Sequence, residues 1–268
     1  MKKLSILFLF ISSVAFGQQA FRTLSGTGYV YYPSETKTTR AVIYLHGSGE
    51  VGSGSDSDLN KVRNQGLCWY VGQGNKIPFH VFAPQQAVGK SGYSDGLVLK
   101  FINDIRKQYG ITDFLLTGFS MGADGSAWTA ANDTTGLIRG IVCVAPTNTG
   151  YQTAVKLGKK KMPVLIYWGA NDSWKNSGRT IPYTQFPTGY KDGSGIKLEP
   201  TVFPTGGHDS GTWKQVYTNL NLYTWMASLC LPEISGIKDP VKSSYFYSDG
   251  FLYVELESGK VRKFKPSD

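Results

Sequence analysis

The stretch 114-FLLTGFSMGADG-125 decides how the rest of the chain is interpreted. Its apolar start predicts a strand and the residues after Gly122 are compatible with a helix, so a sharp turn is expected at Ser120. Gly118 and Gly122 flank this serine without side-chain bulk, as a nucleophile elbow requires. We interpret Ser120 as a candidate nucleophile. The alternative is a small buried residue in a β–α turn.

Apolar runs and helical patterns alternate along the chain, which predicts an α/β fold with a mostly parallel sheet flanked by helices. The candidate strands are 41-AVIYL-45, 80-HVFAP-84, 113-DFLLTG-118, 140-GIVCVA-145, 163-PVLIYWG-169 and 199-EPTVFP-204. The candidate helices are 93–110, Met121 to about Ala131, and 213–229. The segment 26-GTGYVYYP-33 is expected to be an antiparallel hairpin partner at the sheet edge.

A serine hydroxyl needs an adjacent base before it can attack at neutral pH. The chain has three histidines. His46 directly follows a predicted strand and is expected to brace a loop, whereas His80 opens a strand. His208 lies in 205-TGGHDSGTW-213, after the last predicted strand, where the chain order of serine, acid and histidine places the base. We predict that His208 is the base.

The base must in turn be oriented by a carboxylate. Asp172 follows the apolar strand 164-VLIYWG-169 after a short turn, which brings it to the carboxyl end of the sheet. We choose Asp172 as the acid and keep Asp209, beside the base, as the second choice. The remaining carboxylates are expected on the helix after the elbow (Asp124, Asp133), in a Gly-rich loop (Asp192) or at a strand (Glu199).

Two backbone amides are needed to hold the oxyanion of an acyl-transfer reaction. Met121, the residue after the nucleophile, is one expected donor, and Ser48 in 44-YLHGSGE-50 is the other. Three tryptophans are candidates for stacking on substrate: Trp174 near the acid, Trp213 after the base, and Trp69 in a region read as loop. Trp213 could equally be a core residue that opens a helix.

Four motifs together carry a resemblance: LHGSGE, GFSMG, WGANDSW and GGHDSGTW. From Gly26 to Leu231 the chain resembles the α/β-hydrolase superfamily, in particular secreted esterases related to feruloyl and acetylxylan esterases, polyhydroxybutyrate depolymerases and predicted peptidases. The resemblance implies ester hydrolysis through a serine acyl-enzyme, without metal or cofactor. Many relatives have S-M-G-G at the elbow, where this chain has 120-SMGAD-124, so a difference is expected either in helix packing or in the pocket floor.

The chain divides into three predicted parts. Residues 1–17 combine a basic start, a short apolar run and small residues before a cut after Gly17, which is typical of a secretory signal. Residues 18–231 form the predicted catalytic domain. In residues 232–268, turn signals at Asp249-Gly250 and Ser258-Gly259 predict a small β-meander. We therefore expect a secreted or periplasmic protein without a stable membrane anchor.

The formal net charge is +9, and part of it comes from 159-KKK-161. No aromatic residues are interleaved with these lysines, so we expect a solvated loop and no nucleic-acid partner. The three cysteines match no zinc pattern. Cys143 is expected in the core, and a disulfide between Cys68 and Cys230 is left open.

The sequence thus predicts a serine carboxylic-ester hydrolase. The expected substrate is a carbohydrate-linked, phenolic or polymeric ester, because no long insertion that could form a lid is seen. A serine peptidase with the same triad and a non-catalytic carbohydrate-binding protein remain as alternatives.

Overall fold

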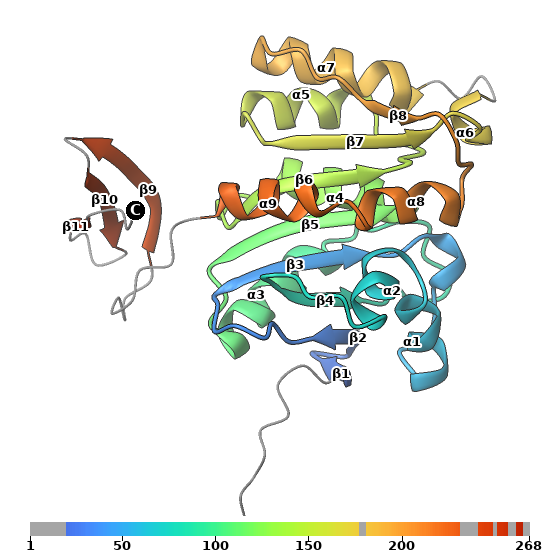
Figure 1. Cartoon of the computed structure of the whole chain (residues 1–268), viewed down its shortest axis with the longest axis horizontal. Coiled ribbons are helices and arrows are strands. Elements are labelled where there is room, and N and C mark those ends of the chain that lie inside the picture. The colour runs from blue at the N-terminus through green and yellow to red at the C-terminus, as the bar shows by residue number, and fades with distance from the viewer. Residues whose placement is uncertain (1–19, 177–180, 231–240, 249–250, 257–260, 265–268) are drawn as a thin grey trace, which may run out of the picture.

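The computed structural model describes residues 20–176, 181–230, 241–248, 251–256 and 261–264. The predicted signal, residues 1–17, lies outside them. The described chain forms an eight-stranded sheet and a separate three-stranded sheet (Figure 1). No helix in the described part of the chain combines the length and the apolar character that crossing a bilayer would need.

The large sheet has the strand order β1-β2-β4-β3-β5-β6-β7-β8. Its strands are β1 (Ala20–Leu24), β2 (Thr27–Tyr32), β3 (Arg40–Leu45), β4 (His80–Pro84), β5 (Asp113–Phe119), β6 (Ile138–Val144), β7 (Val164–Gly169) and β8 (Thr201–Phe203). The six strands from β4 to β8 in this order pair in parallel. β2 pairs antiparallel with both β1 and β4, so β1, which was not predicted, forms the edge. The predicted mostly parallel sheet is confirmed.

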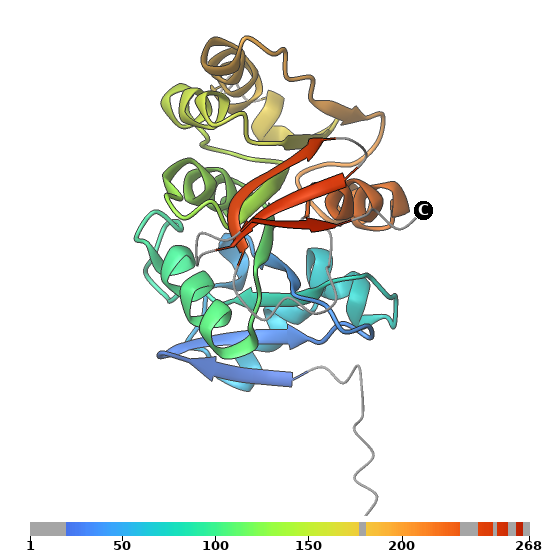
Figure 2. The same ribbon diagram turned by 90° about the vertical axis from the view of Figure 1, so that its left-hand side faces the viewer.

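Helices cover both faces of this sheet (Figure 2). One face carries α3 (Leu97–Tyr109), α4 (Met121–Asn132), α5 (Tyr151–Lys159) and α7 (Phe186–Ser194). The other carries α1 (Asp56–Arg63), α2 (Gly66–Gly72), α8 (Ser210–Tyr217) and α9 (Leu220–Leu229). Short turns complete the elements: η1 (Ser48–Glu50), α6 (Ser173–Asn176) and η2 (Ile181–Gln185). The strands between the two helical layers are buried on both sides, which explains their continuous apolar runs.

The sequence patterns located most elements, but several predictions were wrong. Glu199 lies before β8 and not in it. Asp192 lies in α7 and not in a Gly-rich loop. The helix predicted over 213–229 is two helices, because Asn219 caps a new one by accepting a hydrogen bond from the Asn221 amide. Trp69 lies in α2 and not in a loop.

The C-terminal strands β9 (Val241–Ser248), β10 (Phe251–Leu256) and β11 (Val261–Phe264) pair antiparallel in the order β11-β10-β9. This confirms the predicted meander. The domain boundaries at 17 and 231 stay predictions.

The cysteines are buried. Cys68 and Cys143 are free thiols, and the Cys230 thiol contacts the Met226 carbonyl. The possible disulfide between Cys68 and Cys230 is therefore not formed.

Candidate active site

Ser120 lies between β5 and α4, at the carboxyl end of the sheet. Its backbone has φ 56° and ψ −121°, a conformation that costs a non-glycine residue about 1–3 kcal/mol. Gly118 and Gly122 allow the turn to be this sharp, since a Cβ on Gly122 would collide with the Leu45 carbonyl of β3. The junction between β5 and α4 therefore holds Ser120 in a strained backbone conformation at the start of the helix.

The structure brings the three residues predicted as nucleophile, base and acid together. His208 Nε2 lies 2.8 Å from Ser120 Oγ, and His208 Nδ1 lies 2.9 Å from Asp172 Oδ2. These residues follow β5, β7 and β8, whose carboxyl ends lie at the same edge of the sheet. With Nδ1–H donated to the carboxylate, Nε2 can accept the serine proton.

Asp172 is fully buried and held from several sides. Its Oδ1 accepts the Trp174 amide at 2.8 Å, which leaves Oδ2 directed at His208. The turn that carries it is tied to the base loop, because the Asn171 amide donates to the Gly206 carbonyl at 3.0 Å. The acid and the base are thus fixed to one another by backbone as well as by side chain.

The second-choice acid has a different place. Asp209 caps the start of α8, where its side chain accepts the Gly211 amide at 2.7 Å. Of the other carboxylates considered, Asp133 caps the far end of α4 and Asp192 accepts the Tyr151 hydroxyl.

His46 braces the loop after β3, as expected. Its ring is fully buried, Nδ1 donates to the Gly47 carbonyl at 2.7 Å, and Nε2 accepts the Gln86 amide at 2.9 Å. Burial lowers the pKa of His46 to about 4, so the ring is neutral at pH 7.

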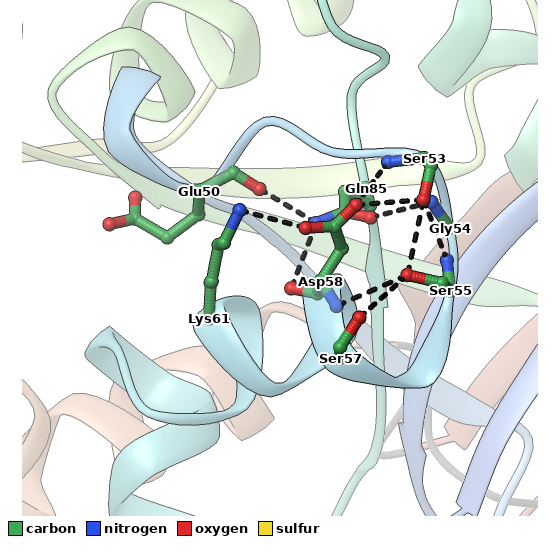
Figure 3. A network of polar contacts seen from close by, with 8 residues as sticks. All are labelled: Glu50, Ser53, Gly54, Ser55, Ser57, Asp58, Lys61 and Gln85. Carbon is green, nitrogen blue, oxygen red and sulfur yellow. Dashed lines mark hydrogen bonds and ion pairs between the residues drawn. The ribbon is translucent and has the colours of Figure 1, made fainter.

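A network of polar contacts fixes the rest of this loop to the end of β4 (Figure 3). Gln85 Nε2 donates to the carbonyls of Glu50 and Asp58, at 2.8 and 3.0 Å, and its Oε1 accepts the Gly54 amide. Gln65 Oε1 accepts the Gly47 amide at 3.2 Å. The backbone around Ser48 is therefore held in place before any substrate arrives, as an oxyanion hole requires.

A cavity of about 340 Å³ opens beside Ser120. Ser48 and Met121, the two predicted oxyanion donors, both line it. Its other lining residues are Ser91, Gly92, Tyr93, Ser94, Asp124, Gly125, Trp128, Thr147, Asn148, Thr149, Thr153 and Trp174. The wall is rich in hydroxyl groups and has aromatic rings at several points.

The three predicted stacking tryptophans have different places. Trp174 lines the cavity, is 39% exposed, and has its ring centroid 5.9 Å from that of His208. Trp213 is buried and packs edge-on against Trp69 at 5.3 Å, and neither of these two lines the cavity. Trp213 thus occupies the core position left open as its alternative, and the Lys214 ammonium group lies over both rings. A role of Trp69 or Trp213 in substrate binding stays a prediction.

Sequence reasoning missed the face of α4 that lines the cavity. Met121, Asp124, Gly125 and Trp128 are spaced three and four residues apart, so they lie on one side of the helix. Tyr93 packs directly on this face, since a Cβ on Gly125 would collide with its ring. Helical spacing counted from Ser120 could have predicted that Trp128 lies on the same side of the helix as the nucleophile.

Among the described residues, no group of three or more His, Cys, Asp or Glu side chains could hold a metal ion.

No family model matches this chain, and no curated protein matches it. Solved structures do. A protein described as a predicted CIB-like hydrolase from Thermoplasma acidophilum is 22% identical, with a TM-score of 0.52 over 80% of this chain and 99% of its own. A thermostable esterase is 20% identical, with a TM-score of 0.52 over 79% of this chain and 62% of its own. An acylaminoacyl peptidase from Pyrococcus horikoshii is 12% identical, with a TM-score of 0.54 over 84% of this chain and 44% of its own.

The neighbours are hydrolases of the α/β-hydrolase type. The chain has the α/β-hydrolase fold.

Proposed function

We propose that the protein is a serine hydrolase that cleaves carboxylic esters through a covalent acyl-enzyme. One observation carries the proposal: Ser120, strained at the elbow, contacts a histidine whose other nitrogen contacts a buried carboxylate. A serine in this position has both a base and an orienting acid, which is what nucleophilic catalysis by a hydroxyl requires. The α/β-hydrolase fold supports the same reaction class.

The proposed reaction has two halves. Ser120 Oγ attacks the ester carbonyl while His208 Nε2 takes its proton, and the Met121 and Ser48 amides hold the oxyanion. His208 then protonates the leaving alcohol, and the acyl group stays on Ser120. Water, deprotonated by His208, releases the acid and restores the serine. Asp172 holds His208 in the tautomer that accepts at Nε2 and stabilises its charged form.

The proposed substrate is a carbohydrate-linked, phenolic or polymeric ester. The cavity beside Ser120 is bordered by Trp174, whose exposed ring could stack on a sugar or phenolic group. The predicted leader supports a secreted or periplasmic location, where such polymers occur.

The test combines covalent labelling with a substrate panel. A fluorophosphonate probe should label the protein, and the purified chain should hydrolyse at least one of p-nitrophenyl acetate, methyl ferulate and acetylated xylan. Ser120→Ala should abolish labelling and lower kcat/KM at least about a thousandfold, as removal of a nucleophile does elsewhere.

Ser126→Ala is the matched control, since this buried serine of the same helix donates to the Gly122 carbonyl and has no proposed role in the reaction. It should keep both labelling and turnover. Labelling that persists in Ser120→Ala would contradict the assigned nucleophile. Cleavage of a peptide amide in the same panel, with all esters left intact, would indicate the peptidase instead.

A further inference from the structure

Asp124 lies one helical turn after Ser120 and has a set of contacts that the proposed reaction does not use. Its carboxylate accepts the amides of Thr147 and Asn148 at 3.0–3.2 Å. It also accepts the hydroxyls of Thr147 at 2.8 Å and Thr149 at 2.6 Å. One side chain thus holds three consecutive residues of the loop that follows β6.

The same three residues, with Asp124 itself, form one wall of the cavity beside Ser120. Asp124 is bonded to the nucleophile turn as well, because its own amide donates to the Ser120 carbonyl at 3.2 Å. The loop is therefore fixed relative to Ser120 through a single carboxylate. Asp124 directly follows Ala123, the residue at which the chain departs from the S-M-G-G pattern of the proteins it resembles.

The chemistry of the wall limits what it can bind well. Asp124 is the one charged side chain among the lining residues, and its oxygens are already occupied by four donor groups. The other polar side chains of the lining carry hydroxyls or, at Asn148, an amide, and its apolar groups are the Met121 thioether and the rings of Tyr93, Trp128 and Trp174. The Thr147 and Thr149 hydroxyls already donate to Asp124, so an alkyl chain placed here would remove water from their acceptor lone pairs without replacing it, at a cost for each group. A ligand with many hydroxyls would pair with them and still offer a face to a ring.

We propose that Asp124 is a positioning residue that fixes Thr147, Asn148 and Thr149 as a subsite for a hydroxyl-rich part of the ester, such as a sugar. The inference rests on the proposed function for its link to catalysis, although binding at the subsite can be measured without turnover. Asp124 does not touch the reacting atoms. Its effect is on how well the larger part of the substrate is held beside Ser120.

Asp124→Asn is the informative variant. An amide presents one acceptor oxygen in place of two, and its NH₂ group faces the loop amides that the carboxylate accepted. The wall should loosen while Ser120 and His208 stay in contact. For a monoacetylated methyl β-xylopyranoside we expect KM to rise about tenfold or more, with kcat within about threefold. For p-nitrophenyl acetate, which leaves the wall unused, both constants should stay within about threefold.

The matched control is Asp133→Asn, at the opposite end of the same helix. Asp133 accepts the Thr135 amide and hydroxyl at 2.8 and 2.6 Å, in a turn that does not line the cavity. This variant should lower the thermal midpoint without changing the ratio of the two KM values. Thr149→Val removes one donor and no charge, so it should raise the sugar-ester KM less than Asp124→Asn does. If Asp124→Asn fails to fold, Thr149→Val tests the subsite in its place.

Binding of xylobiose, followed by tryptophan fluorescence, separates this inference from the proposed function. Xylobiose should bind Ser120→Ala and bind the double variant Ser120→Ala, Asp124→Asn at least about tenfold more weakly. If xylobiose binds in this way and no ester is cleaved, the subsite stands and the proposed function fails. Three results would overturn the inference. They are equal KM increases on both esters in Asp124→Asn, the same change in the ratio of KM values in Asp133→Asn, and a xylobiose affinity that Asp124→Asn does not change.

Discussion

Two aspartates near His208 differ in what they can do for it, although the sequence places both within reach of the base. Asp172 is buried and directs one oxygen at Nδ1, whereas Asp209 directs its carboxylate at the amide of Gly211. A residue-scale comparison of the two is therefore a direct test of the proposed acid.

Asp172→Asn should lower kcat by about three to four orders of magnitude, because the amide donates to Nδ1 and stabilises the tautomer that cannot accept at Nε2. Asp209→Asn should change kcat less than about threefold, since asparagine caps a helix about as well as aspartate. Steady-state kinetics on p-nitrophenyl acetate would compare them, with thermal midpoints as the folding control. A larger loss in Asp209→Asn would show that the acid has been misassigned.

At the scale of elements, the His46 ring connects the carboxyl ends of β3 and β4 through two hydrogen bonds, and the bond to the Gln86 amide requires the neutral ring. Protonation would turn Nε2 into a donor facing the Gln86 amide, which is also a donor. The folded pKa of about 4 lies below the ordinary value of 6.5. The unfolded chain therefore takes up this proton first as the pH falls.

The contribution of His46 to the free energy of unfolding should therefore be fully present above about pH 6.5 and should decrease as the pH falls toward 4. The loss from this one group is at most about 3 kcal/mol. Urea titrations between pH 4 and 7.5 would measure it. His46→Gln should be less stable at pH 7 but should show a flatter dependence over this interval; an unchanged slope would mean that other groups cause the acid sensitivity.

Elements with a strong local pattern could be predicted from the sequence, and those defined by a partner could not. The buried parallel strands have continuous apolar runs, and α3 has an apolar face that ends at Gly110 in a left-handed conformation. In α7, Gly189 and Gly193 look like loop residues. They instead allow close contact with α5, since a Cβ on either would collide with a backbone carbonyl of that helix.

The candidate site shows the same division. The elbow and its flanking glycines could be predicted because the backbone turn itself demands them. The wall around Asp124 could not, because its partners lie 23 to 25 residues away in sequence and only the packing of α4 against the end of β6 brings them together. The core position of Trp213 could not be decided from the sequence, because its edge-on contact with Trp69 joins two helices far apart in the chain and leaves no local pattern.

At the scale of the whole molecule, the described strands β9, β10 and β11 pair with one another, and none of them pairs with a described strand of the large sheet. A chain truncated after Leu231 should therefore fold and hydrolyse p-nitrophenyl acetate with kcat/KM within about threefold of the full chain. Circular dichroism and kinetics on both forms would test this. A soluble, folded truncate without activity would show that the C-terminal segment helps to build the site.

Ser120 and His208 are 88 residues apart in sequence, and β6, β7 and β8 are all formed between them. During synthesis Ser120 leaves the ribosome before β6, whose Val144 carbonyl accepts the Ser120 amide, and long before His208, so the nascent chain first carries the nucleophile without its base. In refolding, contacts of such long separation close late. Recovery of the proposed esterase activity would then report the last step of sheet assembly, after the signals from helix formation have reached their final values.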